Sequence, residues 1–288
     1  MLSEIAPEEG FLCLFIVIII AKNKESEEKM TKEEQKIADI QKMIPLNDVF
    51  FEALAAEPGV CEEILQTILQ DDKLSVSDVI VQSSERNIYG RSVRLDALCT
   101  LGNGTKCNIE VQRSDNDDHF RRVRFNASSI TVKSSDTGEK FKNVVELYVV
   151  YISEFDIINA GKTIYHVEKV VKETEQVIDD GLHEIYVNTA IDDGSDIAEL
   201  MHCFTQETVN NVKFPNLCKA IHHLKSTKGG NKRMCKIMDK YLIESIIKTS
   251  QSFNASDEMI VAELMKQLEM SEEEAKKALD EFKAVSYA

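Results

Sequence analysis

The sequence has few of the residues that mark several protein classes. Tryptophan is absent, and 288 residues include only 4 prolines and 11 glycines, too few for a collagen-like or low-complexity chain. The 7 cysteines form no Cys-x-x-Cys pair, the spacing typical of zinc and redox sites. Basic residues are outnumbered, since 34 Lys and Arg stand against 50 Asp and Glu and the net charge is −16. This balance repels nucleic acid on average, so any nucleic-acid contact needs a local basic surface.

Long hydrophobic runs are also missing. An apolar run covers residues 11–21, about half of the ~20 residues that a membrane-spanning helix needs. Acidic residues precede this run and Lys22 follows it, a pattern that does not fit a secretory signal peptide. We therefore expect no membrane span and a reducing cytoplasmic location. We interpret residues 1–29 as upstream sequence ahead of a start at Met30, and a short membrane-surface anchor is the competing interpretation.

The remaining sequence alternates between helical and extended patterns. Apolar residues at helical spacing predict two short helices in residues 49–69 and a third in residues 119–132. Beta-branched runs bounded by polar turns predict strands, and these runs cover residues 76–82, 91–100, 105–112, 144–152, 163–171 and 181–190. Everything beyond Ser195 has helical spacing. The sequence therefore predicts a mixed α/β protein that ends in helices.

Residues 92–112 predict an antiparallel hairpin. If Gly102-Asn103-Gly104 forms the loop, Asp96 faces Glu110 directly across the two strands. The opposite face is then continuously apolar and consists of Leu95, Ala97, Cys99, Cys107, Ile109 and Val111. A two-residue loop would place the two carboxylates on opposite faces. Burial and chemistry thus favour the same register.

The two facing carboxylates need an explanation, because groups about 5 Å apart at Cβ repel each other when both are ionised. The pair can be solvated, share a proton or bind a cation. Mg²⁺ suits such a pair, because it takes oxygen ligands and keeps several waters beside one or two carboxylates and a substrate phosphate. On geometry alone, a solvated pair or one neutralised by Arg94 stands on equal terms with a metal site.

The segment VRLDALCTLGNGTKCNIEVQRSDNDDHFRRVRFNAS resembles the PD-(D/E)XK nuclease family transposases, a group that includes the Rpn recombination-promoting nucleases. The resemblance extends from about Pro45 to about Phe204. It implies a restriction-endonuclease-like core, in which helices flank a mixed β-sheet. We accordingly expect an N-terminal extension in residues 1–42, a nuclease-like domain in residues 43–215 and a helical C-terminal region in residues 216–288.

The resemblance also implies an activity. The expected function is a metal-dependent DNA endonuclease, associated with mobile elements or recombination, that uses Mg²⁺ or Mn²⁺ and no small-molecule cofactor. A catalytically inactive nuclease-fold module that binds DNA or protein is the alternative. The helices of residues 216–288 are a candidate for homodimer formation, although their apolar spacing fits internal packing equally well.

Individual roles follow from the same resemblance. Asp96 corresponds to the first motif acid and Glu110-Val111-Gln112 to the (D/E)-x-K tripeptide, so Asp96, Glu110 and the Val111 carbonyl would bind the metal. Asp48 would supply a further acid from the first helix of the core, and Arg122 the basic residue after the motif.

Two positions depart from the family pattern, since Leu95 replaces the motif proline and Gln112 replaces the motif lysine. Glutamine can neither carry a positive charge nor take up a proton at neutral pH. Activation of the attacking water would then fall to the metal, while Gln112 orients that water.

Two basic segments are candidates for DNA contact. Arg121, Arg122 and Arg124 closely follow the motif strand. Residues 219–240 carry seven Lys or Arg against Asp239 alone, a charge of +6 within a chain of −16, and include Lys232 and Arg233 beside a predicted Gly229-Gly230 loop. The competing interpretations are pairing of the arginines with nearby aspartates and a solvated helix face for the lysines.

Overall fold

The computed structural model describes residues 30–85, 93–115, 118–136, 138 and 140–287. The chain divides into two compact units, residues 1–39 and 40–288. Helix α2 (Lys32–Lys42) crosses from the first unit into the second. Our interpretation of residues 1–29 concerns a segment outside the described residues. Among the described helices, none combines the length and the apolarity that crossing a membrane requires.

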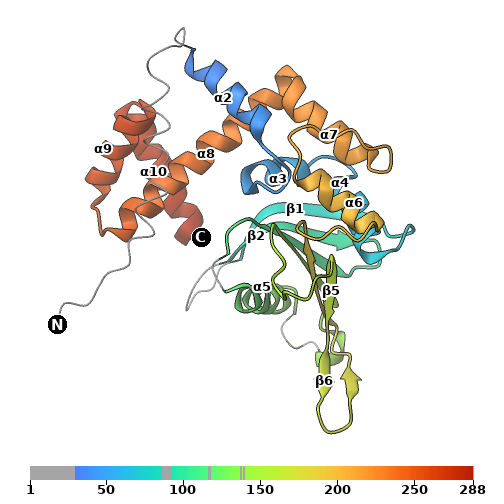
Figure 1. Ribbon diagram of the computed structural model, residues 1–288. Helices are drawn as coiled ribbons and strands as arrows, with labels where there is room; N and C mark the ends of the chain where they lie inside the picture. The colour runs from blue at the N-terminus through green and yellow to red at the C-terminus, as the bar shows by residue number, and fades with distance from the viewer. Residues whose placement is uncertain (1–29, 86–92, 116–117, 137, 139, 288) are drawn as a thin grey trace, which may run out of the picture. The chain divides into compact units, whose positions relative to one another are not determined.

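The second unit is built on a six-stranded mixed sheet with the order β1-β2-β3-β4-β8-β5 (Figure 1). Strands β1 to β3 pair antiparallel, β3, β4 and β8 pair parallel, and β5 returns antiparallel to β8. The strands are β1 (Val76–Glu85), β2 (Val93–Leu101), β3 (Lys106–Gln112), β4 (Leu147–Ser153), β5 (Ile164–Val167) and β8 (Leu182–Asn188). The expected architecture, a mixed sheet flanked by helices and followed by C-terminal helices, is confirmed.

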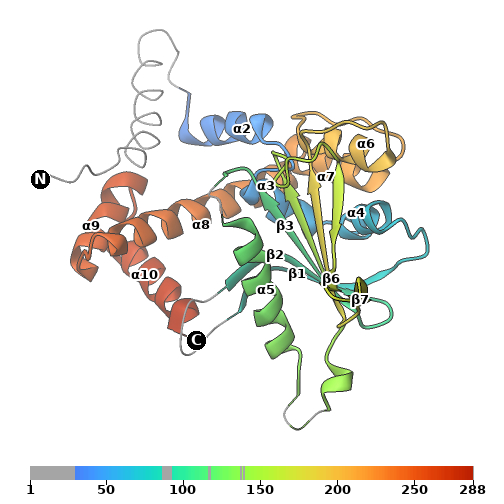
Figure 2. The same cartoon turned by 60° about the horizontal axis from the view of Figure 1, so that its bottom comes forward.

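Helices cover both faces of this sheet (Figures 1 and 2). One face carries the larger apolar core, formed with α3 (Asp48–Ala55), α4 (Val60–Leu69), α6 (Asp196–Phe204) and α7 (Pro215–Ser226). Helix α5 (His119–Lys133) packs on the other face over a smaller core, in which Val123, Ala127 and Ile130 meet Leu98 and Val149. The sheet therefore separates two apolar cores, and the core under α5 contains fewer buried residues.

The hairpin register is the predicted one. Ala97 pairs with Ile109, Leu98 with Asn108 and Cys99 with Cys107, as a three-residue loop requires. Leu95 differs from the expectation, because it is buried in the smaller core under α5 rather than in the larger one. The β2 residues paired with β3 run only from Ala97 to Thr100. Leu95 lies beyond these pairs, so pairing with β3 does not fix the face of the sheet on which its side chain lies.

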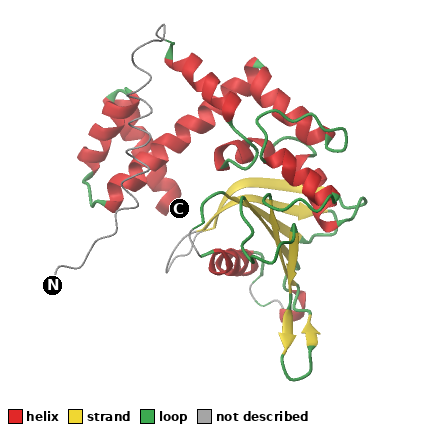
Figure 3. Cartoon of the chain, in the orientation of Figure 1, coloured by secondary structure: helices red, strands yellow, loops and turns green. Residues whose placement is uncertain are grey.

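Two further substructures lie outside the sheet. Strands β6 (Lys169–Val171) and β7 (Gln176–Ile178) form a separate hairpin that projects from the sheet, and a 3-10 helix, η2 (Phe141–Asn143), precedes β4 (Figures 1 and 3). At the other end of the chain, α9 (Asp257–Leu268) and α10 (Glu272–Tyr287) share an apolar cluster with the last part of α8 (Lys228–Ser252). This internal packing accounts for the apolar spacing that left dimer formation open.

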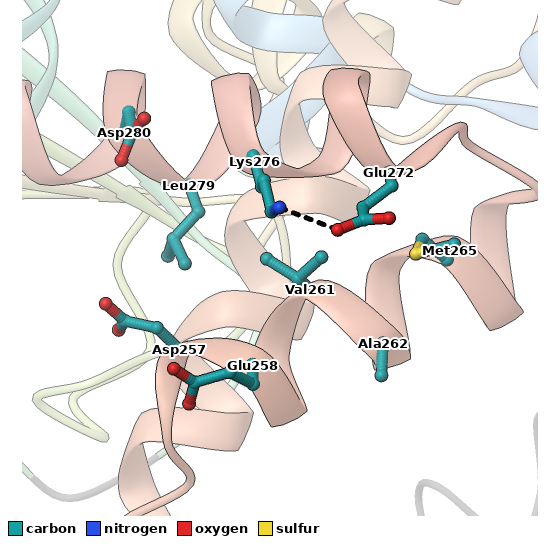
Figure 4. A pocket seen from close by; sticks show the side chains of 9 residues that line it. All are labelled: Asp257, Glu258, Val261, Ala262, Met265, Glu272, Lys276, Leu279 and Asp280. Carbon is teal, nitrogen blue, oxygen red and sulfur yellow. Dashed lines mark hydrogen bonds and ion pairs between the residues drawn. The ribbon is translucent and has the colours of Figure 1, made fainter.

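A capping box formed by Ser271 and Glu274 starts α10. The Ser271 N–H donates to the Glu274 carboxylate at 2.9 Å, and the Glu274 N–H donates to the Ser271 hydroxyl at 3.3 Å. Helices α9 and α10 border a hollow of about 410 Å³, whose walls combine apolar side chains with acidic ones (Figure 4). On the α10 side, Lys276 pairs with Glu272 across one helical turn.

The predicted Gly229-Gly230 loop is wrong, because both glycines lie in the first turn of α8. Thr227 caps this helix, and its hydroxyl accepts a hydrogen bond from the Gly230 N–H at 3.0 Å. Gly230 is buried against the end of α7, where an added Cβ would lie 2.1 Å from the His223 carbonyl oxygen. Glycine is therefore required for the close approach of two helices rather than for flexibility.

We predict that Gly230→Ala destabilises the protein, because the methyl group would meet backbone that cannot move aside. The free energy of unfolding should fall by at least about 3 kcal/mol. Gly229→Ala is the matched control, since its Cβ would meet nothing within 4 Å and should stabilise the helix by about 0.5 kcal/mol. Denaturant unfolding of the full chain measures both changes. Equal effects of the two substitutions would contradict the packing argument.

Candidate active site

Asp96 and Glu110 come together under α5 through the end of the β2–β3 ladder. Beyond the Ala97–Ile109 pair the Asp96 carboxylate replaces a backbone acceptor, and its Oδ2 accepts the Val111 N–H at 3.0 Å. The Asp96 backbone N–H in turn donates to the Glu110 carboxylate. Each carboxylate thus accepts a hydrogen bond from the backbone on the other strand, at or next to the other acid. The two carboxylates lie on the same side of the sheet.

Glu110 is the more deeply buried of the two acids, with 6% of its surface exposed. Burial raises its pKa well above the usual range, and the neighbouring Asp96 charge raises this pKa further. Hydrogen bonds from Asn108 and from the Asp96 backbone, together with the Arg122 charge, act in the opposite direction. The Asn108 Nδ2 donates to Glu110 Oε1 at 2.7 Å.

Asn108 adds an unpaired acceptor to this cluster. The residue is fully buried, and its Oδ1 is the buried side-chain atom without a hydrogen-bond partner among the described residues. Two carboxylates and the Asn108 amide oxygen bring oxygen atoms together, and oxygen atoms are the ligands that a hard cation takes. Within the part of the chain that is described, no group of three or more His, Cys, Asp or Glu is placed to hold a metal. The fit therefore depends on two carboxylates supplemented by neutral oxygens.

A buried aromatic pair adjoins the acids and was missed in the sequence. Tyr151 of β4 lies opposite Glu110 in the parallel β3–β4 pairing, and its hydroxyl is 2.9 Å from His119 Nδ1 at the start of α5. The other ring nitrogen, His119 Nε2, is 3.1 Å from Asp115 Oδ1. Burial raises the pKa of Tyr151, and the Arg122 charge lowers it. Tyr151 is buried, with 1% of its surface exposed.

Of the three arginines of α5 that were predicted to contact DNA, one lies near the acid pair. Arg122 is close enough for its charge to act on both Glu110 and Tyr151, and its Nη2 lies 3.5 Å from Asp118 Oδ1. Arg121 and Arg124 are exposed on α5. The Gln112 amide nitrogen donates to the Ser114 carbonyl at 2.7 Å. The Arg94 side chain, which could neutralise the pair, lies outside the described side chains.

Asp48 is placed elsewhere. It is exposed at the start of α3, and its Oδ2 accepts a hydrogen bond from the Tyr241 hydroxyl of α8 at 3.2 Å. Helix α3 packs on the larger core through Phe50 and Phe51, on the face of the sheet opposite to Glu110. The structure therefore does not bring Asp48 to the acid pair.

The basic residues of α7 and α8 also divide into two groups. Arg233 forms an ion pair with Glu57, and its Nη2 donates to the Ala53 carbonyl at the end of α3. Lys225 is buried, and its Nζ donates to the carbonyls of Gln41, Met43 and Glu207 at 2.6–2.7 Å. Burial lowers the pKa of Lys225 to about 8.

Only part of the +6 charge of residues 219–240 is therefore available at the surface, because Arg233 and Lys225 bind groups within the fold. Lys232 is exposed, together with Lys228 and Lys236 on the same side of α8.

We predict that Glu110→Gln stabilises the metal-free protein. The raised pKa of Glu110 means that the folded state binds this proton more tightly than the unfolded state, so the ionised carboxylate costs stability as pH rises above its unfolded value. At pH 8, the free energy of unfolding should rise by on the order of 1–3 kcal/mol, and the gain should vanish in acid. Exposed Glu173→Gln is the control, expected to change stability at neither pH. Unfolding curves at pH 8 and pH 4 with a chelator present test this, and a gain that is the same at both would contradict it.

The comparison with known proteins extends the likeness beyond the motif strands. The family model of the PD-(D/E)XK nuclease family transposases matches residues 45–288, so it includes the helices after Phe204 as well as the sheet. A search of curated proteins and a search of solved structures each gave no match. The family match covers most of the chain, and it includes the hairpin on which Asp96 and Glu110 meet. The chain belongs to the PD-(D/E)XK nuclease family transposases.

Proposed function

We propose that the chain is a divalent-metal-dependent endodeoxyribonuclease that hydrolyses phosphodiester bonds in DNA. The observation that carries this proposal is the reciprocal fixing of Asp96 and Glu110 by each other's backbone, which holds two carboxylates together under α5 despite their repulsion. A family of nucleases supplies the reaction class. Association with mobile elements or recombination is part of the same proposal.

The two carboxylates and the Val111 carbonyl would hold Mg²⁺ or Mn²⁺. When bound, such an ion would supply Lewis-acid chemistry for phosphodiester hydrolysis. Asp96 and Glu110, which repel each other when both are ionised, would then be ligands of one shared divalent cation. Tyr151 and His119 form the buried wall beside Glu110 and limit the water that reaches it.

The missing motif lysine is the main departure from the family pattern. Gln112 is held by the Ser114 carbonyl through its amide nitrogen, which leaves the amide oxygen as the group that orients a water. Arg122 places a positive charge near Glu110 and is the best-positioned arginine of α5 to contact a scissile phosphate. Arg121 and Arg124 would contact the DNA backbone on either side.

A second DNA-contacting surface is proposed on α8. Lys228, Lys232 and Lys236 follow one another at intervals of four residues and are exposed, so they form a row along one side of the helix. Adjacent members are about 6 Å apart along the helix axis. Such a row gives an acidic protein a local surface for phosphates.

A catalytically silent module that binds DNA or protein is the second candidate. The replacement of the motif lysine by Gln112 favours it, because a glutamine amide carries no charge and its nitrogen donates to the Ser114 carbonyl. Binding of DNA that is indifferent to Mg²⁺, with no nicking, would distinguish this module from the enzyme.

The proposed location is the cytoplasm. The six described cysteines are free, and four of them are buried, a pattern typical of proteins in a reducing compartment.

We predict that Asp96→Asn abolishes cleavage, because the amide cannot supply the negative oxygen ligand although it can still accept the Val111 N–H. Nicking of supercoiled plasmid in Mg²⁺ should fall by at least about 100-fold. Melting temperatures should stay close to those of the parent chain, and exposed Asp179→Asn serves as the control. A parent chain that nicks DNA equally well in a chelator, or an Asp96→Asn variant that keeps full activity, would refute the mechanism.

We predict that charge reversal of Lys228, Lys232 and Lys236 weakens DNA binding through lost phosphate contacts. The slope of log K against log salt concentration should become shallower by about one for each lysine. Lys172→Glu, in the turn between β6 and β7, is the matched exposed control. Binding isotherms at several salt concentrations provide the measurement, and an unchanged slope would exclude α8 as a DNA-contacting surface.

A further inference from the structure

Asn108 lies in the middle of β3, two residues before Glu110 and on the same face of the sheet. It is completely buried, and its Nδ2 donates to Glu110 Oε1 at 2.7 Å. This hydrogen bond fixes which end of the amide faces the carboxylate. The amide oxygen therefore points away from Glu110 but lies only one amide width from it.

Among the described residues, none donates a hydrogen bond to that oxygen. Leu98 faces Asn108 across β2 and Val149 faces it across β4, and neither side chain has a donor. Asn108 Oδ1 is the buried side-chain atom without a partner in the described part of the chain. A buried acceptor without a donor costs free energy, so the hydrogen bond to Glu110 explains the amide nitrogen but not the amide oxygen.

Asn188 shows what a structural asparagine looks like in this protein. It is also buried, but its Nδ2 donates to the carbonyls of Lys162 and Thr163. Its Oδ1 accepts the N–H groups of Ala190 and Ile191. Both ends of that amide are satisfied by the main chain, whereas only one end of Asn108 is satisfied.

We infer that Asn108 is a positioning residue of the metal site: its Nδ2 holds the Glu110 carboxylate in place, and its Oδ1 accepts a hydrogen bond from a water of the bound cation's hydration shell. The inference rests on the part of the proposed function in which Asp96 and Glu110 bind a divalent cation. Mg²⁺ keeps several waters when it binds to proteins, and these waters are the donors that the fold does not provide. A neutral amide supplies the acceptor without adding a third negative charge to a buried pair.

The competing explanation is a buried water that satisfies Oδ1 with or without metal. The test measures binding of Mn²⁺ alone, and separately of Mg²⁺ alone, to the full chain by titration calorimetry without DNA. Asn108→Leu should weaken the affinity for either ion at least about tenfold, the usual effect of removing an outer-shell partner of a metal ligand. Its melting temperature in a chelator should fall less than that of Asn188→Leu, which removes the side-chain partner of the Lys162 carbonyl and of the Ala190 and Ile191 N–H groups.

Asn188→Leu is the matched control and should leave the metal affinity within about twofold of the parent chain. Asn108→Asp retains an acceptor oxygen but loses the Nδ2 donor that holds Glu110, so this variant should recover only part of the affinity lost in Asn108→Leu. An Asn108→Leu variant whose metal affinity stays within twofold of the parent would overturn the inference. A parent chain that binds neither ion more tightly than Asp96→Asn does would also overturn it.

Failure of the nuclease proposal would give a different result. A parent chain that binds Mn²⁺ through Asp96 and Glu110 but does not nick plasmid DNA would refute the proposed enzyme and leave the role of Asn108 standing. A parent chain that nicks DNA, together with an Asn108→Leu variant of unchanged metal affinity, would refute the inference alone.

Discussion

The exchange of hydrogen bonds between Asp96 and the Glu110-Val111 segment is the constraint on which the site depends. The Val111 N–H binds the Asp96 carboxylate, and the Asp96 N–H binds the Glu110 carboxylate. A backbone amide cannot swing away as a side chain can, so these main-chain donors hold the two carboxylates near each other. The main chain therefore positions the two carboxylates. Their mutual repulsion remains, and a bound cation would relieve it.

The layer under α5 makes this imbalance stronger. The smaller core on that face surrounds Glu110 with apolar groups, and burial rather than the Asp96 charge is the larger cause of its raised pKa. The larger core on the opposite face carries most of the helices and the apolar side of the hairpin. The larger apolar core thus lies on one face of the sheet and the acid pair on the other. Burial of the acids reduces the stability of the layer that contains them.

Parts of this arrangement could be predicted from the sequence because they depend on local rules. The alternation of apolar residues around Gly102-Asn103-Gly104 determines the register, since a shift of one residue would expose the whole apolar face. Asn108, Tyr151 and His119 could not be assigned in the same way. Tyr151 meets Glu110 only through the parallel pairing of β3 with β4, whose partners are 41 residues apart in sequence, and no local pattern encodes that pairing.

The errors in the basic segment have a common physical origin. A lysine or arginine count treats each charge as solvated, but Lys225 and Arg233 bind carbonyl oxygens or a carboxylate inside the fold. The Gly229-Gly230 pair was read as a loop because glycine is most often used for conformational freedom. At Gly230 the missing Cβ matters instead, because it allows α8 to start directly against the last turn of α7. That contact brings the first turn of α8 against α7, while Lys228, Lys232 and Lys236 of the same helix are exposed.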